Sequence, residues 1–101
     1  MLSYVDWETL KNEADASYTP EQRRAYEAAE AEVEAQIALT ELIYAMRTRA
    51  GLSQADLARR MGAAETYVSA LERGFRMPTV AALNRLAHAT GNRLRIEAVP
   101  A

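Results

Sequence analysis

The spacing of apolar and polar positions predicts a short helix over residues 54–61. Its apolar residues recur on one helix face, at Leu57, Ala58 and Met61. Ser53 precedes the segment with a hydroxyl that can accept a hydrogen bond from the free N–H groups of a helix start. Gly62 follows and can turn sharply without steric cost. We therefore expect a capped, amphipathic helix that ends in a tight turn.

A second amphipathic segment follows this turn, over residues 65–73. Val68 and Leu71 fall on its inward face. Polar or small residues fall largely on the outward face, at Glu65, Thr66, Ser69 and Ala70. Two short helices that cross at a glycine-containing turn are the arrangement with which many proteins place one helix in the major groove of DNA. The pattern therefore predicts a helix-turn-helix.

A longer helix is predicted before this motif. Thr19, Pro20 and Gln22 carry the pattern of an N-cap, a first-turn proline and a capping box. The apolar stripe that follows is thin at first, at Tyr26, Ala29, Val33 and Ile37. It widens at Leu39, Leu42, Ile43 and Met46. We therefore expect an exposed, acidic rod that enters the core near Leu39, with a break near Ala38 as an alternative.

A helix and a strand are predicted after the motif. Thr79 can cap a helix that ends at Gly91 and has one apolar face, at Val80, Leu83, Leu86 and Ala87. Residues 93–99 then alternate polar and apolar side chains, which is the period of a strand. A lone strand in a helical protein has no sheet to join, so we expect it to pair with the same strand of a second copy. The residues expected at this dimer contact are Leu94, Ile96 and Ala98.

Length and composition narrow the possibilities further. The 101 residues suffice for one domain with an appended arm, and the scarcity of β-branched residues favours an all-α fold. The absence of cysteine excludes disulfides and thiolate metal sites. No run of about 18 apolar residues is present, so no membrane segment is expected. The acidic start lacks the basic region of a secretory signal, and we expect a cytoplasmic protein.

The net charge of −2 hides an asymmetry along the chain. Residues 1–38 contain nine acidic and three basic side chains, whereas residues 39–101 contain nine arginines and five acidic side chains. This division predicts phosphates as partners of the basic part and a basic molecule as the partner of the acidic part. The alternative is an acidic, solvated helix that only keeps the protein soluble.

The sequence shows no constellation typical of an enzyme. Neither a Ser/His/Asp arrangement, nor a carboxylate pair, nor a phosphate-binding loop can be recognised. His88 has no cysteine, histidine or acidic residue at the spacing of metal ligands. We therefore expect no catalytic activity, no metal and no cofactor.

Residues 42–96 resemble the Cro/C1-type (Xre) helix-turn-helix domain. The matching positions are Arg47, Gly51 to Gln54, Leu57, Ala58, Gly62, Val68, Ser69, Leu71 to Gly74, Arg76 and Pro78. The resemblance implies a lambda-repressor-like helical bundle. The chain then divides into an acidic N-terminal extension (1–38), the helix-turn-helix domain (39–92) and a C-terminal dimerisation strand (93–101). This layout resembles HigA-type antitoxins of type II toxin–antitoxin systems.

The resemblance also implies roles for individual residues. The expected DNA contacts are Gln54, Ala64, Glu65, Thr66, Tyr67, Ser69, Ala70, Arg73 and Arg76. Among these, Glu65, Thr66 and Ala70 would face bases, because a carboxylate can accept a hydrogen bond from cytosine N4 and a methyl group can pack on thymine. The family often has a hydroxyl where this chain has Ala64 and a long polar residue where it has Ala70. Base readout would thus rest on Glu65 and Thr66, which favours a dimer.

Arg47 and Glu72 have a different implied role. The corresponding residues of the family form an ion pair that ties the first helix of the domain to the recognition helix. We therefore expect Glu72 to stabilise the fold rather than to contact bases, since an unpaired carboxylate near the DNA backbone would be repulsive.

Two functions fit these features. In the first, the chain is an antitoxin that represses its own operon, binds operator DNA as a homodimer, and neutralises a basic, RNA-cleaving toxin of the RelE-like class with its acidic arm. The expected toxin contacts are Trp7, Leu10, Tyr26 and Val33, although Trp7 could instead dock on the protein's own core. In the second, the chain is a stand-alone repressor without a toxin partner.

Overall fold

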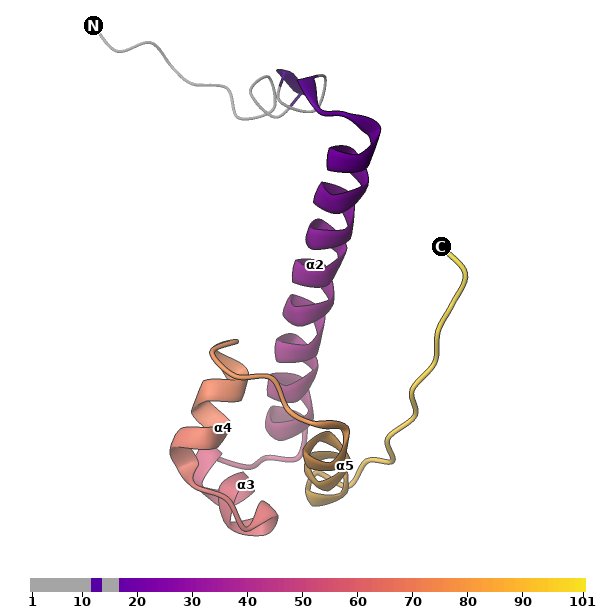
Figure 1. The fold of residues 1–101 in the computed structure, drawn as a ribbon. Coiled ribbons are helices and arrows are strands. Elements are labelled where there is room, and N and C mark those ends of the chain that lie inside the picture. Colours follow the sequence, from indigo (N-terminus) through magenta and orange to yellow (C-terminus); the bar gives the residue numbers. More distant parts are fainter. Residues whose placement is uncertain (1–11, 14–16) are drawn as a thin grey trace, which may run out of the picture. The chain divides into compact units, whose positions relative to one another are not determined.

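The computed structural model describes residues 12–13 and 17–101 (Figure 1). Its elements in chain order are α2 (Pro20–Arg49), α3 (Gln54–Met61), α4 (Glu65–Glu72) and α5 (Val80–Ala89). The described part of the chain contains no strand, so its class is all-α. The chain divides into two compact units, Met1–Glu34 and Ala35–Ala101.

Helix α2 begins where the sequence predicts it. The Thr19 hydroxyl accepts a hydrogen bond from the Gln22 N–H at 3.1 Å, and the Thr19 N–H donates to the Gln22 side chain at 2.9 Å. These two bonds complete the capping box in front of Pro20. The helix continues to Arg49, so the alternative of a break near Ala38 is wrong.

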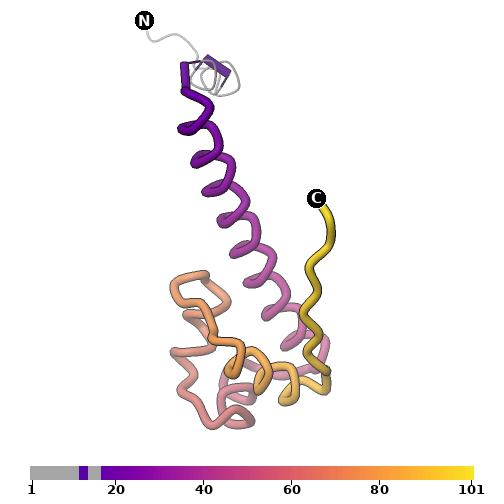
Figure 2. The backbone as a smooth tube through the Cα atoms, turned by 45° about the vertical axis from the view of Figure 1, so that its right-hand side comes forward, coloured from indigo at the N-terminus to yellow at the C-terminus, as the bar shows by residue number. Residues whose placement is uncertain are grey.

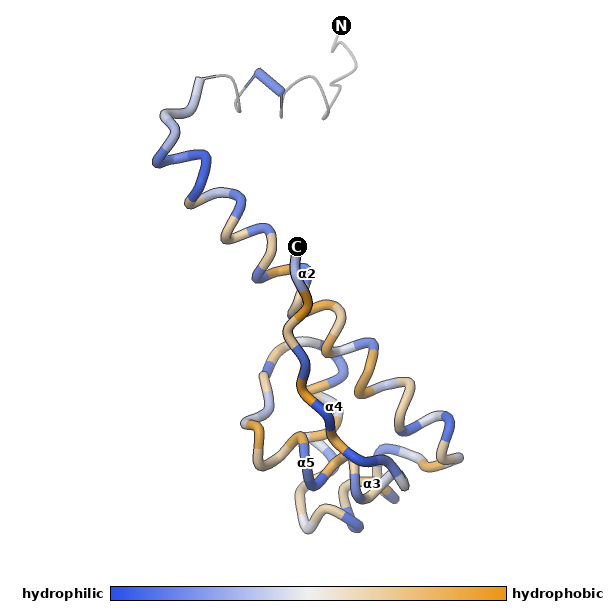
Figure 3. Tube along the Cα trace, turned by 90° about the vertical axis from the view of Figure 1, so that its right-hand side faces the viewer, coloured by the Kyte–Doolittle hydropathy of each residue, from blue (hydrophilic) through white to orange (hydrophobic). Residues whose placement is uncertain are grey.

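The first part of α2 has almost no buried surface. Residues 20–38 are exposed, apart from a half-buried Tyr26. Figure 3 shows hydrophilic positions predominating in its first turns and hydrophobic ones becoming frequent further along. The prediction of an exposed acidic segment before Leu39 is therefore confirmed. In the described part of the chain, no helix is both long and apolar enough to span a membrane.

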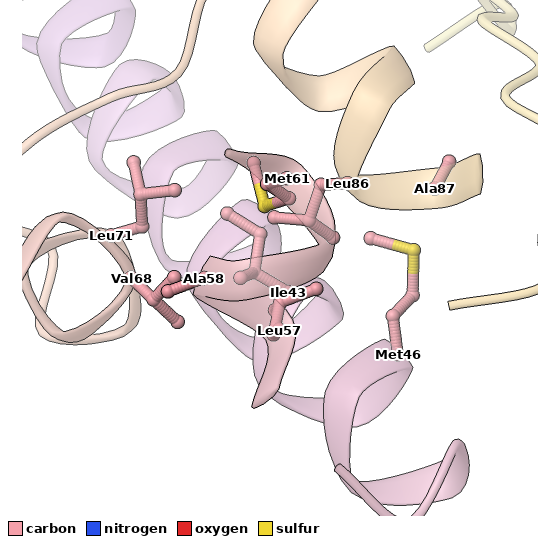
Figure 4. Close-up of a cluster of buried hydrophobic side chains, with 9 residues drawn as sticks. All are labelled: Ile43, Met46, Leu57, Ala58, Met61, Val68, Leu71, Leu86 and Ala87. Carbon is pink, nitrogen blue, oxygen red and sulfur yellow. The ribbon is translucent and has the colours of Figure 1, made fainter. Parts of the chain in front are cut away.

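The core of the second unit is formed by all its helices (Figure 4). The end of α2 contributes Ile43 and Met46, and the other helices contribute Leu57, Ala58, Met61, Val68, Leu71, Leu86 and Ala87. The fully buried aliphatic side chains come from all four helices, and α3 packs against both α4 and α5. Burial of one such side chain is worth roughly 1.5–3 kcal/mol, so this small cluster holds the helix-turn-helix together.

Two apolar residues do not lie where the pattern placed them. Leu42 is 46% exposed and Val80 is 63% exposed. Ile43 and Met46, three positions apart, define the buried side of α2 here, and Leu42, which points about 100° away from Ile43, falls outside it. Val80 is the first residue of α5, whose buried face instead passes through Ala82, Leu86 and Ala87.

The predicted strand at residues 93–99 is wrong. Helix α5 ends at Ala89, and the buried hydroxyl of the following Thr90 donates to the carbonyl oxygens of Leu86 and Ala87. Residues 92–101 then have no regular secondary structure, and Figure 2 shows them as an extended segment that leads away from the end of the last helix. Leu94 packs against the core of its own chain, whereas Ile96 is 70% exposed. Period-two alternation produces a strand only beside a partner strand, and the described residues of the chain contain none.

Candidate nucleic-acid interface

Helices α3 and α4 are joined by a turn that the sequence enforces. Gly62 has φ 66° and ψ 33°, which is the left-handed conformation. Glycine adopts it more easily than other residues because it has no Cβ. The N–H groups of Gly62 and Ala63 donate to carbonyl oxygens of the last turn of α3, to Arg59 at 3.2 Å and Ala58 at 2.9 Å. The chain therefore turns within the three residues between Met61 and Glu65, where α4 begins.

The start of α3 is fixed by a capping box. The Ser53 hydroxyl accepts a hydrogen bond from the Asp56 N–H at 3.0 Å, and the Asp56 carboxylate accepts one from the Ser53 N–H at 3.2 Å. Hydrogen bonding from the Ser53 side chain and from its backbone N–H lowers the pKa of the Asp56 carboxyl, and Arg59, which forms an ion pair with it, adds to the effect. Sequence analysis identified the Ser53 cap but not its acidic partner, although an acid three residues after a capping serine is a recognised signal.

The orientation of α4 follows from its buried face. Val68 and Leu71 are fully buried, so the opposite face is turned outward. Glu65 and Thr66 are exposed there, and Ser69 and Ala70 are half-buried. Ala64 precedes the helix without a side-chain cap. The exposed face thus offers one carboxylate and one hydroxyl, beside small residues that allow close approach of another surface.

Two arginines follow α4 in the loop before α5. Both Arg73 and Arg76 are exposed. Arg76 lies over the Tyr67 ring, with its guanidinium carbon 5.1 Å from the ring centre. Arg73 lies 5.8 Å from the centre of the Phe75 ring. In proteins that place a helix in a groove of DNA, positively charged side chains beside that helix commonly bind the DNA phosphates.

Arg47 and Glu72 form a two-bond fork between α2 and α4. Nε of Arg47 donates to Oε2 of Glu72, and Nη2 donates to Oε1, both at 2.8 Å. The side chains are only 13% and 6% exposed. Hydrogen bonding to Glu72 raises the pKa of Arg47 despite the opposing effect of burial. The structure thus brings together the two residues for which the resemblance implied a structural role.

Two further side chains complete this network. Nη1 of Arg47 donates to the Leu52 carbonyl oxygen at 2.9 Å, and the Tyr44 ring lies 5.4 Å from the Arg47 guanidinium carbon. Gln54, expected to contact DNA, is half-buried and places its amide nitrogen 3.5 Å from Oε2 of Glu72. Sequence reasoning missed Tyr44, although a tyrosine three positions before an arginine shares its helix face.

The residues expected to contact a toxin are only partly described. Trp7 and Leu10 lie outside the described residues. Tyr26 is half-buried, with its ring 5.9 Å from that of Tyr18, and Val33 is 53% exposed. Of the residues expected at a dimer contact, Ile96 and Ala98 are exposed and Leu94 is half-buried. Among residues 12–13 and 17–101, no group of three His, Cys, Asp or Glu side chains could hold a metal ion.

Comparison with known proteins agrees with this geometry. A helix-turn-helix family model of Cro/C1 type matches residues 43–96. The uncharacterized HTH-type transcriptional regulator y4dJ of Sinorhizobium fredii (strain NBRC 101917 / NGR234) is 46% identical over 46 residues, which is 46% of this chain and 60% of that protein. The match thus spans less than two thirds of the relative's length. No solved structure matches the chain.

The matched segment contains α3, the Gly62 turn and α4 with their common core. It covers more than half of the chain, which therefore belongs to the helix-turn-helix family.

Proposed function

We propose that the protein is a transcriptional repressor that binds operator DNA with α4 in the major groove. The observation that carries this proposal is the outward face of α4, where Glu65 and Thr66 are exposed beside two exposed arginines, Arg73 and Arg76. The major groove of DNA, about 12 Å wide, admits an α-helix. Occupied operator DNA is then closed to RNA polymerase. The proposal includes neither a catalytic step nor a cofactor.

The residues of the interface divide by chemistry. Glu65 can accept a hydrogen bond from the N4 amino group of cytosine, and the methyl groups of Thr66 and Ala70 can pack on thymine. Arg73 and Arg76 supply affinity for phosphates that does not depend on sequence and falls with salt. Ser69 is close enough to the outward face to add a neutral contact to the backbone, and Gln54 can do so if its amide leaves Glu72.

A homodimer is part of this proposal. One α4 offers few groups that distinguish bases, and each good base contact contributes only about 1–3 kcal/mol of discrimination. Two copies on a two-fold operator, one helical turn or about 34 Å apart, double that discrimination. Size-exclusion chromatography with light scattering, which measures the molar mass of the protein in solution, tests this point. A protein that is still monomeric at concentrations that saturate operator DNA would contradict it.

The test of the main proposal uses DNA from upstream of the protein's own gene. Glu65→Ala and Thr66→Ala should each weaken binding to the specific fragment by about fivefold or more. Affinity for unrelated DNA should rise in Glu65→Ala, which removes a negative charge, and should change little in Thr66→Ala. Glu41→Ala is the matched control, since Glu41 is an exposed acid on α2. Equal losses in Glu65→Ala and in the control would reject α4 as the reading element.

An antitoxin function is the second candidate, favoured by one observation. From Pro20 to Glu34, α2 carries five glutamates and two arginines, and the glutamates are exposed. An exposed acidic helix can occupy the positive groove of a basic, RNA-cleaving toxin of the RelE-like class. The stand-alone repressor accounts equally well for the helix-turn-helix. A cytoplasmic location stays part of both proposals.

Co-expression with the product of the adjacent gene separates the two candidates. An antitoxin should co-purify with a small basic protein and suppress its toxicity. The full-length triple variant Glu27→Gln, Glu32→Gln and Glu34→Gln should lose that suppression and keep its affinity for operator DNA. If the triple variant suppresses toxicity as well as the unmodified chain does, the acidic helix is not the toxin contact.

A further inference from the structure

The two arginines beside α4 lie against aromatic rings of different character. Tyr67, under Arg76, is half-buried and packs against the hydrophobic core. Phe75, under Arg73, is 78% exposed. The Tyr67 ring is therefore held in place by the fold, whereas the Phe75 ring belongs to a loop and has little to hold it. Only one of the two arginines lies on a fixed surface.

The contact between Arg76 and the Tyr67 ring matters for what Arg76 can bind. A guanidinium group is planar, and its N–H donors point outward within that plane. The Arg76 guanidinium carbon lies over the Tyr67 ring, 5.1 Å from its centre, and the N–H donors that point away from the ring stay available. A phosphate takes those donors, often two at once. The cation–π contact with Tyr67 and the binding of a phosphate can therefore take place at the same time.

We propose that Tyr67 is a positioning residue whose ring holds the Arg76 guanidinium beside α4, so that Arg76 binds a DNA phosphodiester group when α4 enters the groove. This inference rests on the proposed DNA-binding function. The resemblance implied that the Tyr67 side chain contacts DNA directly, whereas here it acts on DNA only through Arg76. The ring acts through Arg76, and the Tyr67 hydroxyl is not needed.

The charge on this surface explains why the position of Arg76 should matter. Glu65 lies on the same helix two residues before Tyr67 and places a negative charge on the outward face. A freely moving arginine could turn toward that carboxylate and away from DNA. The core-anchored ring of Tyr67 offers Arg76 a competing site from which its donors stay accessible.

The test measures binding to a DNA duplex of arbitrary sequence, about two helical turns long, by fluorescence anisotropy over a series of salt concentrations. Tyr67→Leu keeps an apolar contact with the core and removes the ring. It should weaken binding by about two- to fivefold, the range expected for an exposed cation–π contact. Tyr67→Phe keeps the ring and should restore the affinity lost in Tyr67→Leu. If Tyr67→Phe binds as weakly as Tyr67→Leu, a hydroxyl contact is indicated and the inference is overturned.

A double-mutant cycle distinguishes an effect of Tyr67 through Arg76 from a merely structural role of Tyr67. Arg76→Ala should weaken binding and reduce the slope of log K against log salt by about 1. In the Arg76→Ala background, Tyr67→Leu should have no further effect, because the ring acts only through Arg76. Tyr67→Leu that weakens binding equally in both backgrounds overturns the inference. Phe75→Leu is the control, and a loss as large as that of Tyr67→Leu would also overturn it.

A second variant keeps the test decisive if Tyr67→Leu fails to fold. Arg76→Lys retains the charge but lacks the planar guanidinium group, which can lie over an aromatic ring and donate two hydrogen bonds to one phosphate. It should weaken binding while the salt slope stays unchanged, and wild-type affinity in Arg76→Lys would overturn the inference. Failure of the proposed function looks different, since the unmodified protein would then not bind the duplex at any salt concentration.

Discussion

Arg47 and Glu72 stand 25 positions apart in the sequence and meet through two hydrogen bonds of 2.8 Å each. The contact joins the last turn of α2 to the last residue of α4. Because Arg47 also donates to the Leu52 carbonyl, one side chain connects α2, the loop before α3, and α4. The orientation of α4 relative to the end of α2 and to α3 thus depends on this polar network as well as on the hydrophobic core.

Removal of Glu72 should therefore be costly. Glu72→Ala leaves the Arg47 guanidinium largely buried without its counter-charge, which costs about 3–5 kcal/mol in comparable pairs. Replacement of both residues, Arg47→Met with Glu72→Leu, should recover most of that loss, because no unpaired charge remains. Urea denaturation of the three proteins checks this. A loss below about 1 kcal/mol for Glu72→Ala would place the pair among ordinary surface salt bridges.

The sequence was most informative where several local signals agree. Around α3, a capping serine, an apolar face and a glycine in the left-handed conformation all point to one helix and one turn, and the structure has both. The start of α2 is similar, because Thr19, Pro20 and Gln22 each restrict the same few backbone positions. Such contacts lie within three or four residues and leave a direct trace in the sequence.

Features that depend on distant contacts were less visible. Residues 93–99 alternate like a strand, but alternation cannot supply the neighbouring strand that hydrogen bonding requires. The position of Arg76 on the Tyr67 ring joins a helix to the loop that follows it, and no spacing rule predicts it. The Arg47–Glu72 contact was implied by the family resemblance alone.

Gly62 offers a direct test of the turn. A Cβ added there would meet no atom within 4 Å, yet φ is 66°. Gly62→Ala should therefore destabilise the domain through backbone strain alone, by about 1–2 kcal/mol. Gly62→Asn should cost less, since asparagine tolerates this conformation better. Thermal unfolding of both variants decides the matter, and equal stability of Gly62→Ala and the unmodified protein would show that the turn relaxes.

The capping box at α3 predicts a pH dependence. Hydrogen bonds from Ser53 hold the pKa of Asp56 below its usual 3.8, so the folded state binds its proton more weakly than the unfolded state does. The resulting stabilisation is fully present above pH 3.8 and is lost as the pH falls through the lower, folded-state pKa. The difference in urea midpoint between the unmodified protein and Asp56→Ala should thus shrink below that value. A difference that stays constant with pH would show that the carboxylate's charge does not contribute.

The single acid on the outward face of α4 should control both the strength and the selectivity of DNA binding. Glu65→Gln removes a negative charge, so affinity for DNA of arbitrary sequence should rise. A glutamine amide can donate and accept, which suits adenine, whereas a carboxylate suits the amino group of cytosine. Selection from a randomised duplex pool should therefore show one position changing from cytosine to adenine, with about 1–3 kcal/mol of altered discrimination. Glu41→Gln, made on an exposed face of α2, should leave the selected sequence unchanged. If Glu65→Gln selects the same sequence as the unmodified protein, Glu65 does not contact a base, and readout must rest on Thr66 and on the shape of the DNA.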